Sequence, residues 1–480
     1  MKKPPYHVGF TSQENELPPT PLAVTGSIPN WLSGSLIRTA PSKFEVGSKS
    51  YRHWFDGLAM LHKFSFHNGQ VQYTCKFLQS NAYRKAKEKN KIVYGEFGTD
   101  PCRDLFQRVF TFFSSPSPTD NGCVNINEYN NQLTATTETP QPVPFHLDTL
   151  ETLHNFQYND QLGGQLTIVH PHYDANGTVY SYVTKFGYKS SYQVYSLAAG
   201  SATRQLIASI PVKEPAYMHS IGITENYIIL TEFPLVVNPL ELRFSKKPFI
   251  ECYRWKPELG TKIHLVHKST GEVQQFVSEP WFSFHHVNAF EQNGDVIFDI
   301  PVFNDTTVID QLYLDHLRNN PVTDVAGQLY RFHIHLEEKK VERRLLSKAS
   351  MELPRINYAR VNARPYEYIF CAGNTIRGNF LDNLTKINVT NGEILVWQEA
   401  NCYPGEPVFV ERPQAVSEDD GLLLSIVLDA AAQNSFLLLL DAGTMQEVAR
   451  ALAPQRITFG FHGQYVLSAA PEQVYQTIHR

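Results

Sequence analysis

Residues 262–292, KIHLVHKSTGEVQQFVSEPWFSFHHVNAFEQ, contain the pattern that decides the fold. An apolar run precedes the polar turn KSTGE, a second run follows it, and a third run begins after Glu-Pro. Short apolar runs bounded by Gly, Ser and Pro are typical of β-strands that are joined as hairpins. The stretch therefore predicts a β-hairpin and a further strand, which carries the adjacent histidines His285 and His286.

The same hairpin recurs along the chain. Six other segments consist of an apolar strand, a polar turn and a second strand: residues 61–77, 144–156, 192–210, 329–346, 384–397 and 436–450. The spacings between their turns fall near the ~40 to 50 residues that are typical of propeller blades, and some are longer through insertions. With no long helical periodicity to cover them, the seven hairpins predict an all-β, seven-bladed propeller that forms a single domain over residues 1–480. A large sandwich or barrel is the alternative.

Composition excludes several functions. Hydrophobic residues make up 42% of the 480 positions, and the net charge of −5, with both signs interspersed, predicts no nucleic-acid face. No segment reaches the ~20 apolar residues that span a bilayer, and the first residues lack the apolar core of a secretory signal. The six cysteines form no CxxC pair, which is typical of reduced thiols in a cytoplasmic protein.

Histidines recur where the inner strands of the blades are expected. In a propeller, the chain returns to the central axis after each hairpin and begins the next blade there. Four histidines lie roughly 14 to 21 residues after a predicted turn, at this inner position: His170, His219, His285 and His462. Alternation along the strand allows only one of His285 and His286 to reach the centre. The sequence therefore predicts a cluster of imidazoles on the axis.

Such a cluster predicts a metal centre. Imidazole binds Fe, Cu, Zn and Ni, but four histidines around tetrahedral zinc would leave no open position. In an octahedron they leave two cis positions free, as an Fe(II) oxygenase requires. Glu352 and Glu406 fall at the same inner position, where carboxylates would accept the Nδ1–H groups of the ligating rings.

The chain resembles the carotenoid cleavage oxygenase family, especially the branch of the animal β-carotene oxygenases and the retinal pigment epithelium isomerohydrolase. The resemblance rests on segments spread over nearly the whole chain: SLIRTAPSKFEVG, YRHWFDGLAMLHKF, GEFGTDPCRDLF, VHPHYD, EPAYMHSIGITENYIIL, FHHVNAFEQNGDVIFDI, WQEANCYPGEPVFV and FHGQYV. It implies a seven-bladed propeller with a dome of loops and helices over the active-site face.

The resemblance also implies the site. The Fe(II) ligands of the family correspond to His170, His219, His285 and His462. The resemblance therefore selects His285 and not His286 as the ligand. Its outer glutamates correspond to Glu352, Glu406 and also Glu138 in TATTETP, a residue that the spacing did not identify.

The implied reaction adds O₂ across a conjugated C=C bond of a lipophilic polyene and yields two carbonyls. It needs no organic cofactor, and the chain has no GxGxxG or P-loop in a strand–turn–helix context.

Peripheral membrane contact is expected, because such a substrate is taken from a membrane. Two segments have the profile of an interfacial amphipathic structure, 100–115 and 233–255. Helices packed on the propeller are the alternative, and we expect a monomer or weak oligomer. A stilbenoid-cleaving dioxygenase, a retinoid isomerohydrolase and a non-enzymatic binding scaffold remain as alternative functions.

Overall fold

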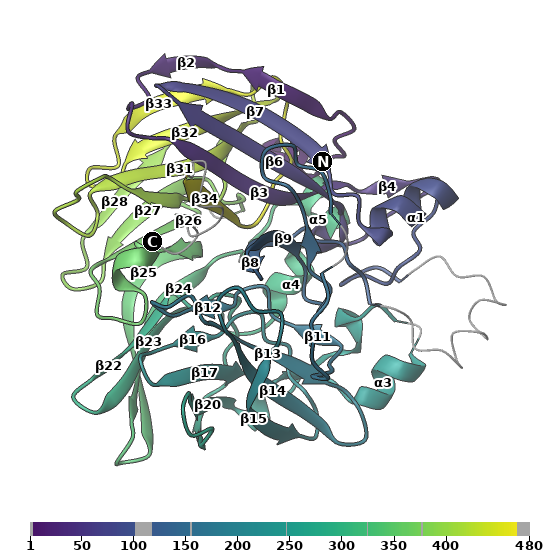
Figure 1. Cartoon of the computed structure of the whole chain (residues 1–480), viewed down its shortest axis with the longest axis vertical. Coiled ribbons are helices and arrows are strands. Elements are labelled where there is room, and N and C mark those ends of the chain that lie inside the picture. Colours follow the sequence, from purple (N-terminus) through teal and green to yellow (C-terminus); the bar gives the residue numbers. More distant parts are fainter. Residues whose placement is uncertain are drawn as a thin grey trace.

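The computed structural model describes residues 3–100, 118–153, 156–245, 247–323, 325–375 and 378–467. These residues are mostly β-structure, in antiparallel sheets that follow one another around the molecule in chain order (Figure 1). The two ends of the described chain meet, because β3 (Gly34–Lys43) pairs with β34 (Gly463–Leu467) and β2 (Ala23–Gly26) pairs with β33 (Glu447–Leu452). Strands from the start of the chain thus lie beside strands from its end.

Three sheets take up the first part of the chain. The first also contains β6 (Leu58–His67), β7 (Gln70–Phe77) and β1 (Leu17–Pro21) outside β3. The second is formed by β8 (Asn125–Tyr129), β9 (Gln132–Thr136) and β10 (Val143–Pro144). The third is formed by β11 (Leu166–Thr167), β12 (His172–Tyr173), β13 (Val179–Lys185), β14 (Ser190–Leu197) and β15 (Gln205–Val212).

Three further sheets complete the set. One is formed by β16 (Gly222–Ile223), β17 (Tyr227–Glu232), β20 (Thr261–His267) and β21 (Val273–Ser278). The next is formed by β22 (Asn288–Gln292), β23 (Asp295–Val302), β24 (Gly327–His335), β25 (Lys340–Arg355), β26 (Tyr368–Gly373), β27 (Asn383–Asn388) and β28 (Ile394–Gln398). In the last, β29 (Cys402–Pro404), β30 (Val408–Glu411), β31 (Gly421–Asp429) and β32 (Asn434–Asp441) precede β33.

Short elements cross between the sheets. Two small ribbons pair β4 (Glu45–Val46) with β5 (Lys49–Ser50) and β18 (Leu235–Val236) with β19 (Arg254–Trp255). The α-helices are α1 (Asn81–Lys89), α3 (Pro239–Phe244), α4 (Thr307–Gln311), α5 (Leu314–Asn319) and α6 (Tyr358–Val361). Single 3₁₀ turns span η1 (Pro5–Phe10), η2 (Trp54–Asp56), η3 (Ile250–Cys252) and η4 (Pro257–Leu259). Within the described residues, no helix combines the length and hydrophobicity that a membrane span requires.

Local sequence explains the tightest hairpins. Asn68-Gly69, Asn130-Asn131 and Asn293-Gly294 form two-residue turns in which both φ angles are positive. This geometry matches the right-handed twist of the flanking strands, and Asn and Gly adopt it at low cost. Inside the sheets, apolar strands such as β32, NSFLLLLD, are buried from Ser435 to Leu440, so they pack against a neighbour on each face.

Six of the seven predicted hairpins are confirmed as β6–β7, β14–β15, β20–β21, β24–β25, β27–β28 and β32–β33. The hairpin predicted at 144–156 is wrong, because beyond Pro144 the segment forms only an isolated bridge between Phe145 and Thr152. The sheet that contains Pro144 has its hairpin at β8–β9 instead. The Asn-Asn turn of this hairpin indicates it more clearly than its strands do, because the strands are only modestly apolar.

Candidate metal centre

The four predicted histidines lie where an edge strand of a sheet begins. His170 lies between β11 and β12, and His219, His285 and His462 precede β16, β22 and β34. Each of these strands is the first or last of its sheet. The position predicted from hairpin spacing is therefore right for all four, although His170 was counted from the hairpin that does not form.

The imidazoles of His170, His219, His285 and His462 converge on one point. One ring nitrogen from each lies within 4.8 Å of the others. His285 Nε2 and His462 Nε2 are 3.1 Å apart, and the ring centroids of His170 and His462 are separated by 4.2 Å. The structure thus brings together all four residues that the sequence selected.

Three of the rings rest against the predicted glutamates. Nδ1 donates from His219 to Glu138 over 2.6 Å, from His285 to Glu352 over 2.6 Å, and from His462 to Glu406 over 2.8 Å. Because a carboxylate can only accept, this network assigns the proton of each neutral ring to Nδ1 and leaves a lone pair on Nε2. The three lone pairs therefore belong to the side of each ring that faces away from its carboxylate.

The converging nitrogens fit a cation. Two Nε2 lone pairs only 3.1 Å apart repel each other unless a positive charge lies between them. In the described part of the chain, Nε2 of His170 is buried without a hydrogen-bond partner, although buried polar atoms are normally paired. A metal ion would satisfy all four nitrogens, so this donor set fits one.

The glutamates are themselves held in place, each by a different group. Tyr217 donates its hydroxyl to Glu138 over 2.9 Å, and the main-chain N–H of Leu353 donates to Glu352 over 2.8 Å. These contacts restrict rotation of the carboxylates, and the carboxylates in turn fix the orientation of the imidazoles that donate to them.

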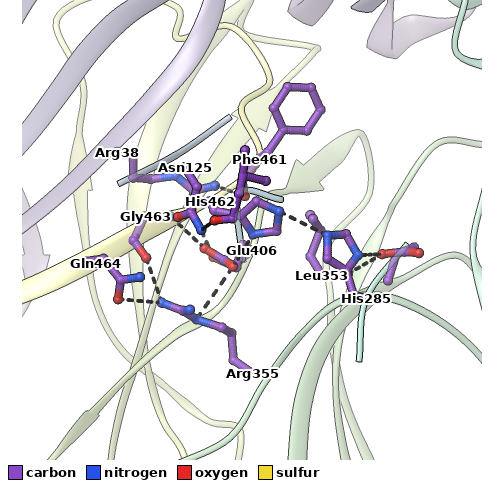
Figure 2. Close-up of polar contacts among 12 residues, drawn as sticks. Arg38, Asn125, His285, Leu353, Arg355, Glu406, Phe461, His462, Gly463 and Gln464 are labelled. Carbon is purple, nitrogen blue, oxygen red and sulfur yellow. Dashed lines mark hydrogen bonds and ion pairs between the residues drawn. The ribbon is translucent and has the colours of Figure 1, made fainter. Parts of the chain in front are cut away.

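Glu406 lies beside two arginines, Arg355 and Arg38 (Figure 2). Its Oε2 accepts the N–H of Gly463 over 2.9 Å, and Arg355 Nε lies 3.6 Å from Oε1. The buried Arg38 donates to the carbonyls of Glu406 and Phe461. The sequence analysis missed both arginines and Tyr217, because none of them belongs to a recognisable metal-ligand pattern.

Burial favours the neutral form of three of the four imidazoles, those of His170, His219 and His462. It lowers the pKa of His170 and His462 well below the usual value, and the charges that neighbouring histidines would carry add to the effect. Burial also lowers the pKa of His219, although the hydrogen bond to Glu138 opposes this shift. Neutral imidazole is the form that binds a metal ion.

His286 points away from the cluster. Its Nδ1 lies 2.8 Å from the Ser220 hydroxyl, and its Nε2 lies 2.9 Å from the Thr231 hydroxyl. Both hydroxyls belong to the preceding sheet region, so the ring joins two chain segments inside the protein. This arrangement confirms the prediction that strand alternation turns one histidine of the pair to the centre and the other into the body of the sheet.

A cavity of about 990 Å³ connects the cluster with the surface. His219, His285 and His462 line its buried part, together with aromatic residues: Trp54, Phe55, Phe97, Phe284, Phe380 and Phe461. The Glu96 carboxyl also lines the cavity; burial raises its pKa well above the usual value, and the Thr119 hydroxyl donates to it over 2.7 Å. The cavity can hold a long apolar molecule beside the histidines.

The predicted membrane segments have different outcomes. Apart from Asp100, segment 100–115 lies outside the described residues. Segment 233–255 contains β18, α3, η3 and β19. On α3, Leu240 and Phe244 are 62% and 57% exposed and also line the cavity. The apolar face of this short helix therefore lies at the solvent-exposed part of the cavity.

Antiparallel sheets around a carboxylate-backed cluster of imidazoles define a mostly β protein with a buried histidine site that fits a metal ion. Residues 10–467 match the family described as retinal pigment epithelial membrane protein. A carotenoid-cleaving dioxygenase, mitochondrial, from Mustela putorius furo is 34% identical over 92% of this chain and 93% of its own length. A β,β-carotene 15,15′-dioxygenase from Rattus norvegicus is 34% identical, covering 97% and 92%.

Solved structures agree with these sequence matches. A cobalt-substituted apocarotenoid oxygenase from Synechocystis superposes with a TM-score of 0.85 at 27% identity, over 97% of this chain and 98% of that one. The chain therefore belongs to the retinal pigment epithelial membrane protein family, whose members include these carotenoid-cleaving enzymes.

Proposed function

We propose that this protein is a non-haem Fe(II) dioxygenase that adds O₂ across a conjugated C=C bond of a carotenoid or apocarotenoid. The bond is cut, each of its carbons receives one oxygen atom, and two aldehydes of the apocarotenal or retinal type are released. One observation carries the proposal: the carboxylate-backed histidines line the buried part of a long aromatic cavity. Membership of a family with carotenoid-cleaving relatives supports the substrate class.

His170, His219, His285 and His462 would hold the ion through their inward-facing nitrogens. Bound Fe(II) supplies the O₂ chemistry that amino-acid side chains lack. Imidazole suits several metals, but zinc with four histidine ligands would be closed to a further reactant. A dioxygenase needs room for O₂ at its metal, which favours iron with two free positions.

The glutamates orient the ligands and set their charge. Each glutamate accepts the Nδ1–H of one imidazole, on the side of the ring opposite to Nε2. The Nε2 donor atoms therefore stay neutral, and the negative charge of the carboxylate is separated from the ion by the width of a ring. Arg355 offsets part of that charge at Glu406. A neutral donor set leaves the positive charge of the ion available to an oxygen reactant.

The cavity walls place the substrate. The rings of Phe284 and Phe461 each make an edge-to-face contact with the ring of Phe55, with centroid separations of 6.1 and 5.0 Å. They offer a planar polyene apolar faces and exclude water from the reacting bond. Burial favours the neutral form of the Glu96 carboxyl, which is one of the polar groups in this wall.

We also propose that the sheets form a seven-bladed propeller with a dome of loops and helices over the site. The seven-stranded sheet supports this count, because β25 pairs with β24 through its first part and with β26 through its last part. Dividing it there gives two four-stranded units, and with the other five large sheets the number of units is seven.

The exposed face of α3 supports substrate entry from a membrane surface. Leu240 and Phe244 would insert at the interface, and Lys247 beside them would face lipid phosphates. The rest of the protein would remain in the cytoplasm as a monomer or weak oligomer. Co-sedimentation with liposomes tests this contact: the wild type should bind, and a Leu240→Ser/Phe244→Ser variant should bind less. Absence of wild-type binding would reject it.

Metal content and products test the function together. The purified protein should contain one iron per chain and should convert β-carotene or an apocarotenal into aldehydes that carry ¹⁸O from ¹⁸O₂, as detected by mass spectrometry. Cleavage of a hydroxystilbene alone would identify a stilbenoid dioxygenase instead. Isomerised alcohol without O₂ uptake would indicate an isomerohydrolase, and full activity in a metal-free preparation would overturn the proposal.

A further inference from the structure

A second group of histidines and carboxylates lies on β23 and β24, at the outer ends of these strands. His333 and His335 are two residues apart on β24, so both side chains lie on the same face of the sheet. Val296 pairs with Ile334, which places Asp295, the first residue of β23, beside His335. The two imidazoles stack with 4.0 Å between centroids and 26° between planes.

Both rings point at one oxygen atom. His333 Nε2 lies 2.8 Å, and His335 Nδ1 lies 2.9 Å, from Oδ2 of Asp295. The other oxygen, Oδ1, accepts the main-chain N–H of Leu336 over 3.2 Å. This backbone contact fixes the carboxylate, so Oδ2 stays directed at the two nitrogens.

An outer carboxylate is also present. Glu342 on β25 places Oε2 3.7 Å from Nε2 of His335, the nitrogen that does not face Asp295. Acceptors in this position stabilise the tautomer that leaves the opposite nitrogen free for a metal. This separation makes the contact electrostatic, longer than the hydrogen bonds between ring and glutamate in the central cluster.

The cluster is accessible and compact. The side chains of His333, His335 and Asp295 are 38%, 22% and 22% exposed, so an ion and its remaining water ligands can reach them. Their donor atoms all lie within 4.8 Å of one another.

We propose that Asp295, His333 and His335 form a peripheral site for a divalent transition metal, with Zn²⁺ as the best-fitting ion. Two imidazole nitrogens and one carboxylate oxygen supply three ligands of a tetrahedral zinc site, and water supplies the fourth. The ion replaces the protons that the rings share with Asp295 and ties the start of β23 to the end of β24. Its role is structural.

The peripheral site is separate from the central cluster and does not rest on the proposed function. From His285 the chain runs along β22 to its end at Gln292 before it turns into β23. Seven extended residues cover roughly 20 Å, so an ion at Asp295 cannot contact the central histidines. The proposal therefore predicts a second metal equivalent beyond any central one.

Zinc titration of the untagged, iron-loaded protein tests the site. With a chromophoric chelator as competitor, the wild type should take up one equivalent of Zn²⁺ while its iron content and activity stay constant. His333→Ala and Asp295→Asn should each lower the Zn²⁺ affinity by more than the about 10- to 100-fold that loss of an outer partner costs. Asp295→Asn keeps the side-chain volume, which guards against a folding defect.

His67→Ala is the matched control. His67 is an exposed histidine at the end of β6, next to a hairpin turn, and has no carboxylate among its hydrogen-bond partners here. This variant should still bind the extra equivalent of Zn²⁺. Zn²⁺ should raise its melting temperature as much as it raises that of the wild type. The proposal is overturned if the wild type binds no more Zn²⁺ than Asp295→Asn, or if His67→Ala loses the same equivalent.

Discussion

The central and peripheral histidine clusters use their carboxylates in opposite positions. At the centre, Glu352 lies behind the ring of His285, on the nitrogen that faces away from the cluster. At the periphery, Asp295 lies in front, among the donor atoms themselves. The central donor set is consequently neutral and the peripheral one carries a negative charge. The position of the carboxylate therefore determines how much positive charge an ion keeps for chemistry.

Burial separates the two regions further. His219, His285 and His462 are 5%, 8% and 3% exposed, and they lie at the buried part of a cavity with many aromatic side chains in its wall. His333 and His335 are open to solvent. A buried, neutral donor set suits a reactive ion that must exclude water, whereas an exposed, anionic set suits an ion that only joins strands.

The largest effect should come from His285. His285→Ala removes one of the four converging nitrogens, so we expect iron content and cleavage activity to fall to background. In the same strand, His286→Ala should retain iron but lower the free energy of unfolding by about 2–4 kcal/mol, through a lost ring and two lost hydrogen bonds. Elemental analysis and urea unfolding distinguish the two variants. Loss of iron from His286→Ala alone would reverse the assignment.

Replacing a carboxylate behind a ring should have an intermediate effect. Glu352→Gln keeps the shape but weakens the acceptor for His285 Nδ1, so the affinity for iron should fall about 10- to 100-fold. Chelator competition measures this affinity. Glu411→Gln is the control, since Glu411 accepts from the Asn357 amide and contacts no ligating ring. Equal affinities in both variants would contradict the role of Glu352.

A smaller loss is expected one contact further out. Tyr217→Phe removes the hydroxyl that donates to Glu138 over 2.9 Å and leaves the ring in place. We expect iron to remain bound and kcat to fall several-fold, because Glu138 can turn more freely behind His219. Steady-state kinetics at saturating substrate checks this. An unchanged kcat would show that the main chain of Glu138, whose carbonyl accepts the N–H of Thr167, positions the carboxylate without the hydroxyl.

The smallest effect concerns buried histidines away from the metal. Burial, aided by the charge of Arg38, lowers the pKa of His62 to about 3, whereas an unfolded histidine titrates near ~6.5. Below that pH the unfolded chain binds a proton that the folded chain does not. This residue should therefore reduce the free energy of unfolding by about 1.4 kcal/mol per pH unit as the pH falls from 6.5 towards 3.

Comparison with a His62→Gln variant isolates that contribution. The stability difference between wild type and variant should be constant above about pH 7.5 and should shift by about 1 kcal/mol, against the wild type, between pH 6.5 and 5.5. Urea unfolding at a series of pH values measures it. A difference that is independent of pH would mean that His62 gains its proton in the folded state.

The sequence by itself determined the strands, most hairpins and the central donors. Period-two alternation and turn residues are local signals, so six hairpins could be predicted. Regular return of the chain to the inner edge then identified the four histidines and two of the glutamates. Glu138 needed the family resemblance, because the β8–β9 hairpin before it was not recognised.

Tertiary structure decided what surrounds those donors. Tyr217, Arg355 and Arg38 reach the glutamates from strands and segments distant in sequence, and no local pattern marks them. The peripheral cluster likewise forms only because β23 and β24 pair in one register, which brings Asp295 beside His335. Local periodicity specifies which face a side chain takes, whereas its partners depend on how the sheets pack, and that is a property of the whole chain.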